Sequence, residues 1–213
     1  MENFIDDLKK TTKNDDKFLD LSKDLALIEN KKSEKTDDHD HHDEENEEHD
    51  HGEEGKKHHH KHHRGGVNPH TWLSVKNAIK ELEMIYKKVA KIDPKNEKYY
   101  AKNLEKAQRD LKALDKKIEK ELSKVKSTEK YFVVSHAAFG YLARDYGLKQ
   151  LAVTGISPED EPTAKQLATI TDFVKEHKIK TIFFEGKATP KVAETLAKNA
   201  GVKTASLYTI CGY

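Results

Sequence analysis

The spacing of apolar residues changes along the chain and divides it into stretches of different structure. From residue 71 onward apolar residues recur at every third or fourth position, which predicts a helix over 71–91. Asp93-Pro94 interrupts this spacing, and a longer, highly charged helix is predicted over 95–126. Thirty-two helical residues span roughly 48 Å, and their narrow apolar stripe favours a strut on the protein surface.

After residue 130 short apolar runs alternate with helical spacing. The runs predict strands over 131–135, 150–154, 181–184 and 203–210. Between them the spacing predicts helices over 137–146, 163–177 and 190–199. Strands that alternate with helices are typical of an α/β fold with a parallel sheet covered on both faces. No helix is predicted after the last strand, so one covering element is expected to be missing.

The stretch before residue 71 has weaker patterns. Residues 2–12 predict a short amphipathic helix, and residues 17–22 predict a short strand. These pieces are too small for a core of their own and resemble the end of a larger domain whose beginning is absent. Residues 30–66 lack aliphatic side chains, and we expect a disordered loop there when no metal is bound.

Composition and charge narrow the classes of function. A net charge of +1 argues against nucleic acid as a general partner. One cysteine, Cys211, rules out a disulfide within the chain and a metal site rich in thiolates. No run of eighteen apolar residues predicts a membrane span, and the N-terminus has no apolar signal core, which by itself would indicate the cytoplasm.

The strongest chemical signal is a tract of ten histidines in twenty-five residues, His39 to His63, interleaved with Asp and Glu. Imidazole is the commonest ligand for transition metals at neutral pH, and with carboxylates it forms a loose trap for ions such as Zn²⁺. A solvated linker or an artificial tag are the alternatives. The interleaved acids and the internal position disfavour a tag.

Two further histidines are candidate ligands within folded structure. His136 follows the predicted strand 131–135, and ligands of open parallel sheets sit at the carboxyl ends of strands. Either a metal ligand or a histidine that caps a helix fits this position. His70 follows Asn68-Pro69 at a helix start beside Trp72, where position alone favours an ordinary polar residue over a metal ligand.

Three other polar positions are weaker candidates. Glu185 closes a predicted strand and could be a ligand or a partner of one, although structural hydrogen bonding is favoured. The acidic loop 157–162 could bind cations weakly or supply the usual charges before a helix. His177 ends a predicted helix, where a cation suits the helix dipole, and no metal role is assigned to it.

Four motifs in order resemble the zinc-specific solute-binding proteins of bacterial ABC importers, a zinc- and manganese-binding family. They are Asn68–Ser74 after the histidine tract, Ser135–Leu148, Gly155–Pro162 and Thr181–Glu185, and the resemblance covers almost the whole chain. It implies two α/β lobes joined by one long helix, with Zn²⁺ in the cleft between them. It also implies that His70 and His136 are zinc ligands and that His39–His63 collect zinc for the cleft. Glu185 matches a position that is not usually a ligand in the zinc branch.

The resemblance also implies a domain organisation. Residues 1–29 would be a remnant of the N-terminal lobe, 30–66 the histidine-rich loop, and 67–92 the helix after it. Residues 93–129 would form the linking helix and 130–213 the C-terminal lobe.

Departures from the family pattern predict a fragment with two of four cleft ligands. The family's first ligand histidine belongs to a Pro-His-Glu-type motif that would lie upstream of Met1. Its acidic ligand follows the last strand, where this chain has Tyr208–Tyr213 with Cys211. Cys211 could substitute as a soft ligand, although a frayed terminus is the favoured interpretation. A signal peptide with a lipid-modified cysteine is missing as well.

The resemblance therefore implies a fragment of an extracytoplasmic, membrane-anchored or periplasmic monomer that captures Zn²⁺ and passes it to an ABC permease. Two histidine ligands favour zinc over manganese. A zinc hydrolase is disfavoured because His-Glu-x-x-His is absent, and a metal-storage protein that depends on the tract alone is the main alternative. Binding is expected to weaken as the pH falls through the imidazole range.

Overall fold

The computed structural model describes residues 4–12, 18–29, 66–126, 130–156, 161–185 and 191–208. In chain order the helical elements before the sheet are α1 (Phe4–Thr12), η2 (Thr71–Leu73), α2 (Val75–Ile92), η3 (Pro94–Asn96) and α3 (Glu97–Ser123). They are followed by β1 (Tyr131–Val134), α4 (Gly140–Tyr146), β2 (Lys149–Ala152), α5 (Ala164–Glu176), β3 (Thr181–Glu185), α6 (Lys191–Ala200) and β4 (Lys203–Leu207). The predicted helices and the strands after residue 130 are confirmed, with shifted ends.

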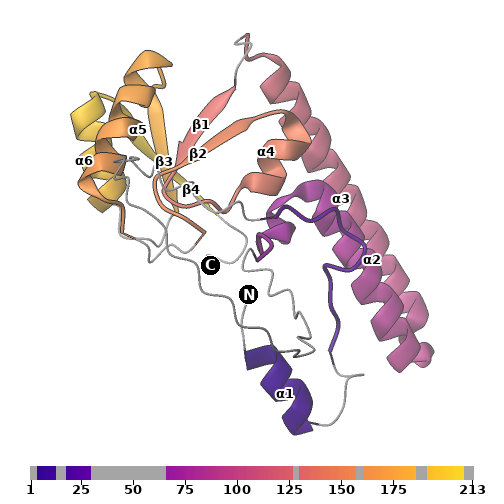
Figure 1. Cartoon of the computed structure of the whole chain (residues 1–213). Helices are drawn as coiled ribbons and strands as arrows, with labels where there is room; N and C mark the ends of the chain where they lie inside the picture. The colour runs from indigo at the N-terminus through magenta and orange to yellow at the C-terminus, as the bar shows by residue number, and fades with distance from the viewer. Residues whose placement is uncertain are drawn as a thin grey trace, which may run out of the picture.

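The four strands form one sheet in the order β2-β1-β3-β4, and every neighbouring pair is parallel. Helices α5 and α6 lie on one face, and α4 lies on the other (Figure 1). The pair α2 and α3 runs along the α4 side of the molecule (Figure 1). The predicted α/β class with a parallel sheet is thus confirmed, and β1 is a central strand with its carboxyl end held on both sides.

The sheet has a different core on each face. Against α5 and α6, Val133 of β1 and Ile182 of β3 are completely buried together with Val174 and Leu196. On the other face Val134 packs with Leu73, Ala138 and Phe139. Because side chains alternate along a strand, β1 contributes to both cores.

Ser74 divides the predicted helix 71–91 into η2 and α2. Its backbone is extended, and its hydroxyl accepts a hydrogen bond from the Asn77 N–H at 3.0 Å, which caps α2. The same hydroxyl donates to the Asp145 carboxylate in α4. This serine therefore fixes both the start of α2 and its position against α4.

Helix α3 returns alongside α2 and buries none of its residues fully, as its narrow apolar stripe predicted. The turn between the helices is held by Tyr100, whose hydroxyl donates to Asp93 Oδ2 at 2.9 Å. Within the described residues, no helix is both long enough and apolar enough to cross a membrane.

The predicted strand over 17–22 is wrong for the residues that can be compared. Residues 18–20 have no regular structure, and a turn begins at residue 21. The Asp20 carboxylate accepts hydrogen bonds from the Ser22 N–H at 2.9 Å and from the Ser22 hydroxyl at 2.6 Å. This local bonding favours a turn. Residues 30–65 lie outside the described residues, so the expected disordered loop stays a prediction.

Tyr141 of α4 ties the segment before the tract to the segment after it. Its side chain is completely buried, its hydroxyl donates to the Asn68 carbonyl oxygen at 2.7 Å, and it accepts from the Ile28 N–H at 3.2 Å. The Asn68 N–H in turn donates to the Ile28 carbonyl oxygen at 2.8 Å. One phenol thus holds residues 28 and 68 against α4.

Replacing Tyr141 by Phe should lower the free energy of unfolding by about 1–3 kcal/mol, because the Ile28 N–H loses its hydrogen-bond acceptor in a partly buried site. Urea denaturation followed by circular dichroism measures this change. Tyr99→Phe is the control, since Tyr99 is 64% exposed. Equal stability of Tyr141→Phe and the parent chain would contradict the assigned tether.

Candidate metal centre

His70 and His136 lie side by side although they are far apart in the sequence. Their ring centroids are 5.4 Å apart, with an angle of 63° between the ring planes. His136 follows the end of β1, and His70 precedes η2. The structure therefore brings together the two histidines that the sequence singled out.

The separation of the two rings suits one shared ion. Tetrahedral zinc bonded to two imidazoles at about 2.0–2.1 Å holds the ring centroids roughly 5 Å apart. The observed 5.4 Å is close to that value. The pair could thus bind one ion without a large movement of either ring.

Asn68 fixes the position of His70. The buried amide oxygen of Asn68 accepts a hydrogen bond from the His70 backbone N–H at 3.0 Å. It also lies 2.8 Å from His70 Nδ1. The amide nitrogen donates to the Ala137 carbonyl oxygen at 3.0 Å, which places the loop of His70 beside that of His136.

These contacts define the tautomer of His70. A backbone N–H can only donate, so the Asn68 atom that faces it must be the oxygen. That oxygen can only accept, so Nδ1 of the neighbouring imidazole must carry the proton. The Nε2 lone pair of His70 is then available for a metal ion.

His136 is buried with a nitrogen atom that lacks a partner. Its side chain is 3% exposed, and its loop is held by the Ala137 N–H, which donates to the Gly155 carbonyl oxygen at 2.8 Å. Nδ1 of His136 has no hydrogen-bond partner among the described residues. Glu185 Oε1 lies 3.4 Å away without hydrogen-bond geometry. A buried nitrogen of this kind calls for a further partner, and a cation is one that fits.

Both imidazoles are kept neutral by their surroundings. Burial, followed by the neighbouring His136, lowers the pKa of His70 to about 4. Burial also lowers the pKa of His136, and the nearby Glu185 carboxylate opposes part of that shift. Neutral imidazole is the form that coordinates metals, so both rings are ready to bind at neutral pH.

The weaker candidate ligands differ in their position relative to the pair of histidines. Glu185 borders the pair through His136, whereas His177 packs its ring 4.1 Å from the Phe173 ring and has no part in the centre. In the described part of the chain, no group of three or more His, Cys, Asp or Glu side chains is arranged for a metal ion. The tract His39–His63, residues 157–160 and Cys211 lie outside the described residues.

Asn68 is the residue whose role the sequence did not reveal. Sequence spacing marked it only as part of a turn before a helix. Its contact with Ala137 depends on tertiary structure, whereas its contact with His70 is local. The one sequence signal for this role was the position of Asn68, two residues before a candidate ligand.

Comparisons with known proteins show which family the chain belongs to. The family described as ZnuA, the periplasmic component A of the zinc-uptake complex, matches residues 1–211. A high-affinity zinc uptake system protein, ZnuA, of Bacillus subtilis is 44% identical over 146 residues, which are 68% of this chain and 45% of that protein.

Solved structures give the same result. A Zn(II)-bound variant of the AdcAII protein of Streptococcus pneumoniae matches with a TM-score of 0.66 and 34% identity, over 89% of this chain and 60% of the other. The laminin-binding protein of Streptococcus agalactiae, described as having adhesin and metal-transporting activity, has a TM-score of 0.62 and 42% identity. That match covers 66% of this chain and 54% of the other.

The chain thus spans about half the length of the relatives it matches. Its parallel sheet is part of the two-lobe architecture of these neighbours, which confirms the predicted fold class. The relatives are zinc-binding components of transporters and not enzymes, so the predictions of zinc and of a non-enzymatic protein are confirmed at the level of the family. The chain belongs to the family of ZnuA, the periplasmic component of zinc-uptake complexes.

Proposed function

We propose that His70 and His136 bind Zn²⁺ in the cleft of an extracytoplasmic component that delivers the ion to an ABC permease. The observation that carries this proposal is the pair of neutral, buried imidazoles with centroids 5.4 Å apart. Two imidazoles fill two positions of a tetrahedral zinc site. The remaining ligands would come from groups outside the described residues or from the part of the relatives' fold that this chain does not span.

The proposed mechanism is capture and release. A catalytic zinc keeps one position open for water and needs a positioned base. The transport role instead requires closed coordination and a way to collect the ion. The ten histidines of the tract would raise the local zinc concentration beside the cleft. We also propose that residues 93–129 link the two lobes. The protein is proposed to be a membrane-anchored or periplasmic monomer.

The storage alternative rests on the same tract and differs in one respect. A storage protein would bind zinc through the tract alone. A transport component keeps a separate site at His70 and His136. The two functions are therefore separated by what remains after the tract is removed.

Deleting residues 37–64 should lower the zinc stoichiometry but leave one site, which isothermal titration calorimetry can count. Adding His136→Ala to this deletion should abolish that site. Loss of a residue that only hydrogen-bonds a ligand lowers metal affinity about 10–100-fold, and loss of the ligand itself lowers it further. His177→Ala in the same background is the matched control and should bind normally. Loss of all binding on deletion alone would favour storage.

Asn68→Leu should weaken zinc binding about 10–100-fold, because Nδ1–H of His70 loses the acceptor that orients the ring. Asn68→Asp keeps the acceptor oxygen for His70 but loses the donor to the Ala137 carbonyl oxygen, so it should restore only part of the affinity. Asn103→Leu on the exposed surface of α3 is the control. Equal affinities for Asn68→Leu and Asn68→Asp would contradict the orienting role.

Zinc binding should weaken at a lower pH than the ordinary imidazole range, which was the expectation from the sequence. Protons compete with zinc for a histidine only at a pH where much of that histidine is protonated. The pKa of His70 is lowered to about 4, so this competition begins at low pH. Zinc affinity of the chain without residues 37–64 should stay level from about pH 8 to 6 and fall below about pH 5. A loss centred near pH 6.5 would show that the imidazoles are not desolvated.

A further inference from the structure

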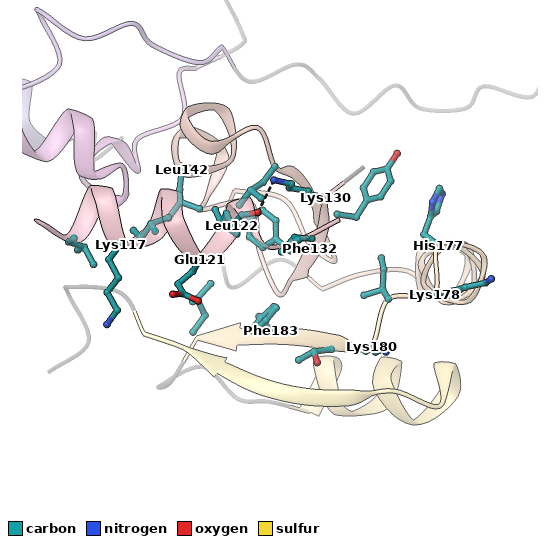
Figure 2. A pocket seen from close by; sticks show the side chains of 18 residues that line it. Lys117, Glu121, Leu122, Lys130, Phe132, Leu142, His177, Lys178, Lys180 and Phe183 are labelled. Carbon is teal, nitrogen blue, oxygen red and sulfur yellow. Dashed lines mark hydrogen bonds between the residues drawn. The ribbon is translucent and has the colours of Figure 1, made fainter. Parts of the chain in front are cut away.

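Glu185 lies beside His136 because of the register of the parallel sheet. Strands β1 and β3 pair so that Val134 is opposite Phe183, and two further residues along each strand lead to His136 and Glu185. Figure 2 shows Phe183 directed from β3 toward Phe132, and Glu185, two residues on, projects from the same side of the strand. The Glu185 Oε1 atom thereby lies 3.4 Å from Nδ1 of His136.

The carboxylate of Glu185 is carried by a regular strand and not by a loop. Glu185 is the last residue of β3, and its partner in the register with β4 is Leu207. The Glu185 side chain is 21% exposed and that of His136 is 3% exposed. The two groups therefore meet largely away from water, where a polar contact is stronger than on the surface.

This contact determines which nitrogen of His136 carries the proton. An ionised carboxylate can only accept hydrogen bonds, so an unprotonated Nδ1 would turn its lone pair toward the lone pairs of Oε1. A proton on Nδ1 makes the same contact attractive. A neutral imidazole carries one such proton, so Nε2 of His136 then keeps its lone pair for a metal ion.

A second arrangement would also fit the distance of 3.4 Å between Nδ1 and Oε1. Two atoms bonded to one tetrahedral zinc at about 2.0–2.1 Å lie roughly 3.3 Å apart, so these two atoms could share an ion. Glu185 would then be a third ligand beside His70 and His136. In the part of the chain that the structure describes, no three such side chains are arranged for a metal ion, which favours the proton over the shared ion.

We propose that Glu185 is a positioning residue of the metal centre, which accepts a hydrogen bond from Nδ1–H of His136 and leaves Nε2 to the ion. The inference rests on the proposed function, since it assigns Glu185 a role in that centre. A small rotation of the ring shortens the 3.4 Å contact to the about 2.7–2.9 Å of a charge-assisted hydrogen bond. Coordination at Nε2 makes Nδ1–H a stronger donor, so the ion and the carboxylate together satisfy the buried ring.

The two imidazoles of the centre would then differ in strength as ligands. His70 is oriented by the neutral amide of Asn68, whereas His136 is oriented by a carboxylate. A carboxylate partner raises the basicity of a ligating imidazole. His136 is therefore the stronger ligand of the pair, and part of the zinc affinity comes from Glu185 without direct contact with the ion.

Nitrogen-15 NMR of the full chain with labelled histidine tests this role without any metal. The His136 ring, identified by its loss in His136→Ala, should be neutral near neutral pH and carry its proton on Nδ1. Glu185→Gln keeps an acceptor oxygen and should keep this tautomer, whereas Glu185→Leu should shift the proton toward Nε2. Glu194→Leu on the exposed surface of α6 is the matched control. A proton on Nε2 in the parent chain, or protons on both nitrogens, would overturn the proposal.

Zinc affinity provides the second arm. Competition with a chromophoric chelator reports the tightest site of the full chain, and Glu185→Leu should weaken that site about 10–100-fold. Glu185→Gln should recover part of the loss, and Glu194→Leu should bind as the parent chain does. Equal losses in the two Glu185 variants would show that the carboxylate itself binds the ion, and no loss in either would show that it has no role. Both results overturn the proposal.

The two arms also separate this inference from the proposed function. A parent chain with the proton of His136 on Nδ1 but without a tight zinc site contradicts the proposed function alone. A tight site with the proton on Nε2 of the metal-free ring contradicts the role of Glu185 alone. Circular dichroism shows whether Glu185→Leu folds, and if it does not, the tautomer in the parent chain and in Glu185→Gln decides.

Discussion

The side-chain amide of Asn68 joins the two segments that carry the candidate ligands. Its oxygen holds the backbone and the ring of His70, and its nitrogen holds the carbonyl oxygen of Ala137 beside His136. The Asn68 backbone is itself fixed by Tyr141 and Ile28. Together with the packing of Leu73 against Ala138 and Phe139, this junction holds the two imidazoles 5.4 Å apart.

Burial also keeps both histidines of this centre in their neutral form. Removing imidazoles from water disfavours their charged form, which lowers the pKa of both histidines and leaves lone pairs free at neutral pH. Burial also leaves Nδ1 of His136 without a hydrogen-bond partner among the described residues. Binding a cation relieves that cost. These features support the proposal that the two histidines bind a metal ion.

The sequence predicted the elements whose apolar spacing is strong. The strands after residue 130 and the helices between them follow directly from alternating runs, and Gly147 and Gly201 end their helices with φ of 64° and 71°. The strand over 17–22 failed because a strand needs a neighbour, and local bonding between Asp20 and Ser22 favours a turn instead. Apolar spacing alone cannot supply that information.

The candidate centre was predictable in part. The rule for parallel sheets placed His136 at a ligand-binding edge, and the family resemblance added His70. The role of Asn68 as a junction was not predictable, since its contact with His70 is local but its contact with Ala137 joins residues that are distant in the sequence.

Zinc-edge X-ray absorption tests the central claim most directly, on the chain without residues 37–64 loaded with one equivalent of Zn²⁺. The account predicts imidazole nitrogen scattering at about 2.0–2.1 Å from two histidines. One imidazole should disappear in His70→Ala and one in His136→Ala. A spectrum unchanged by either substitution would show that the two rings do not share the ion.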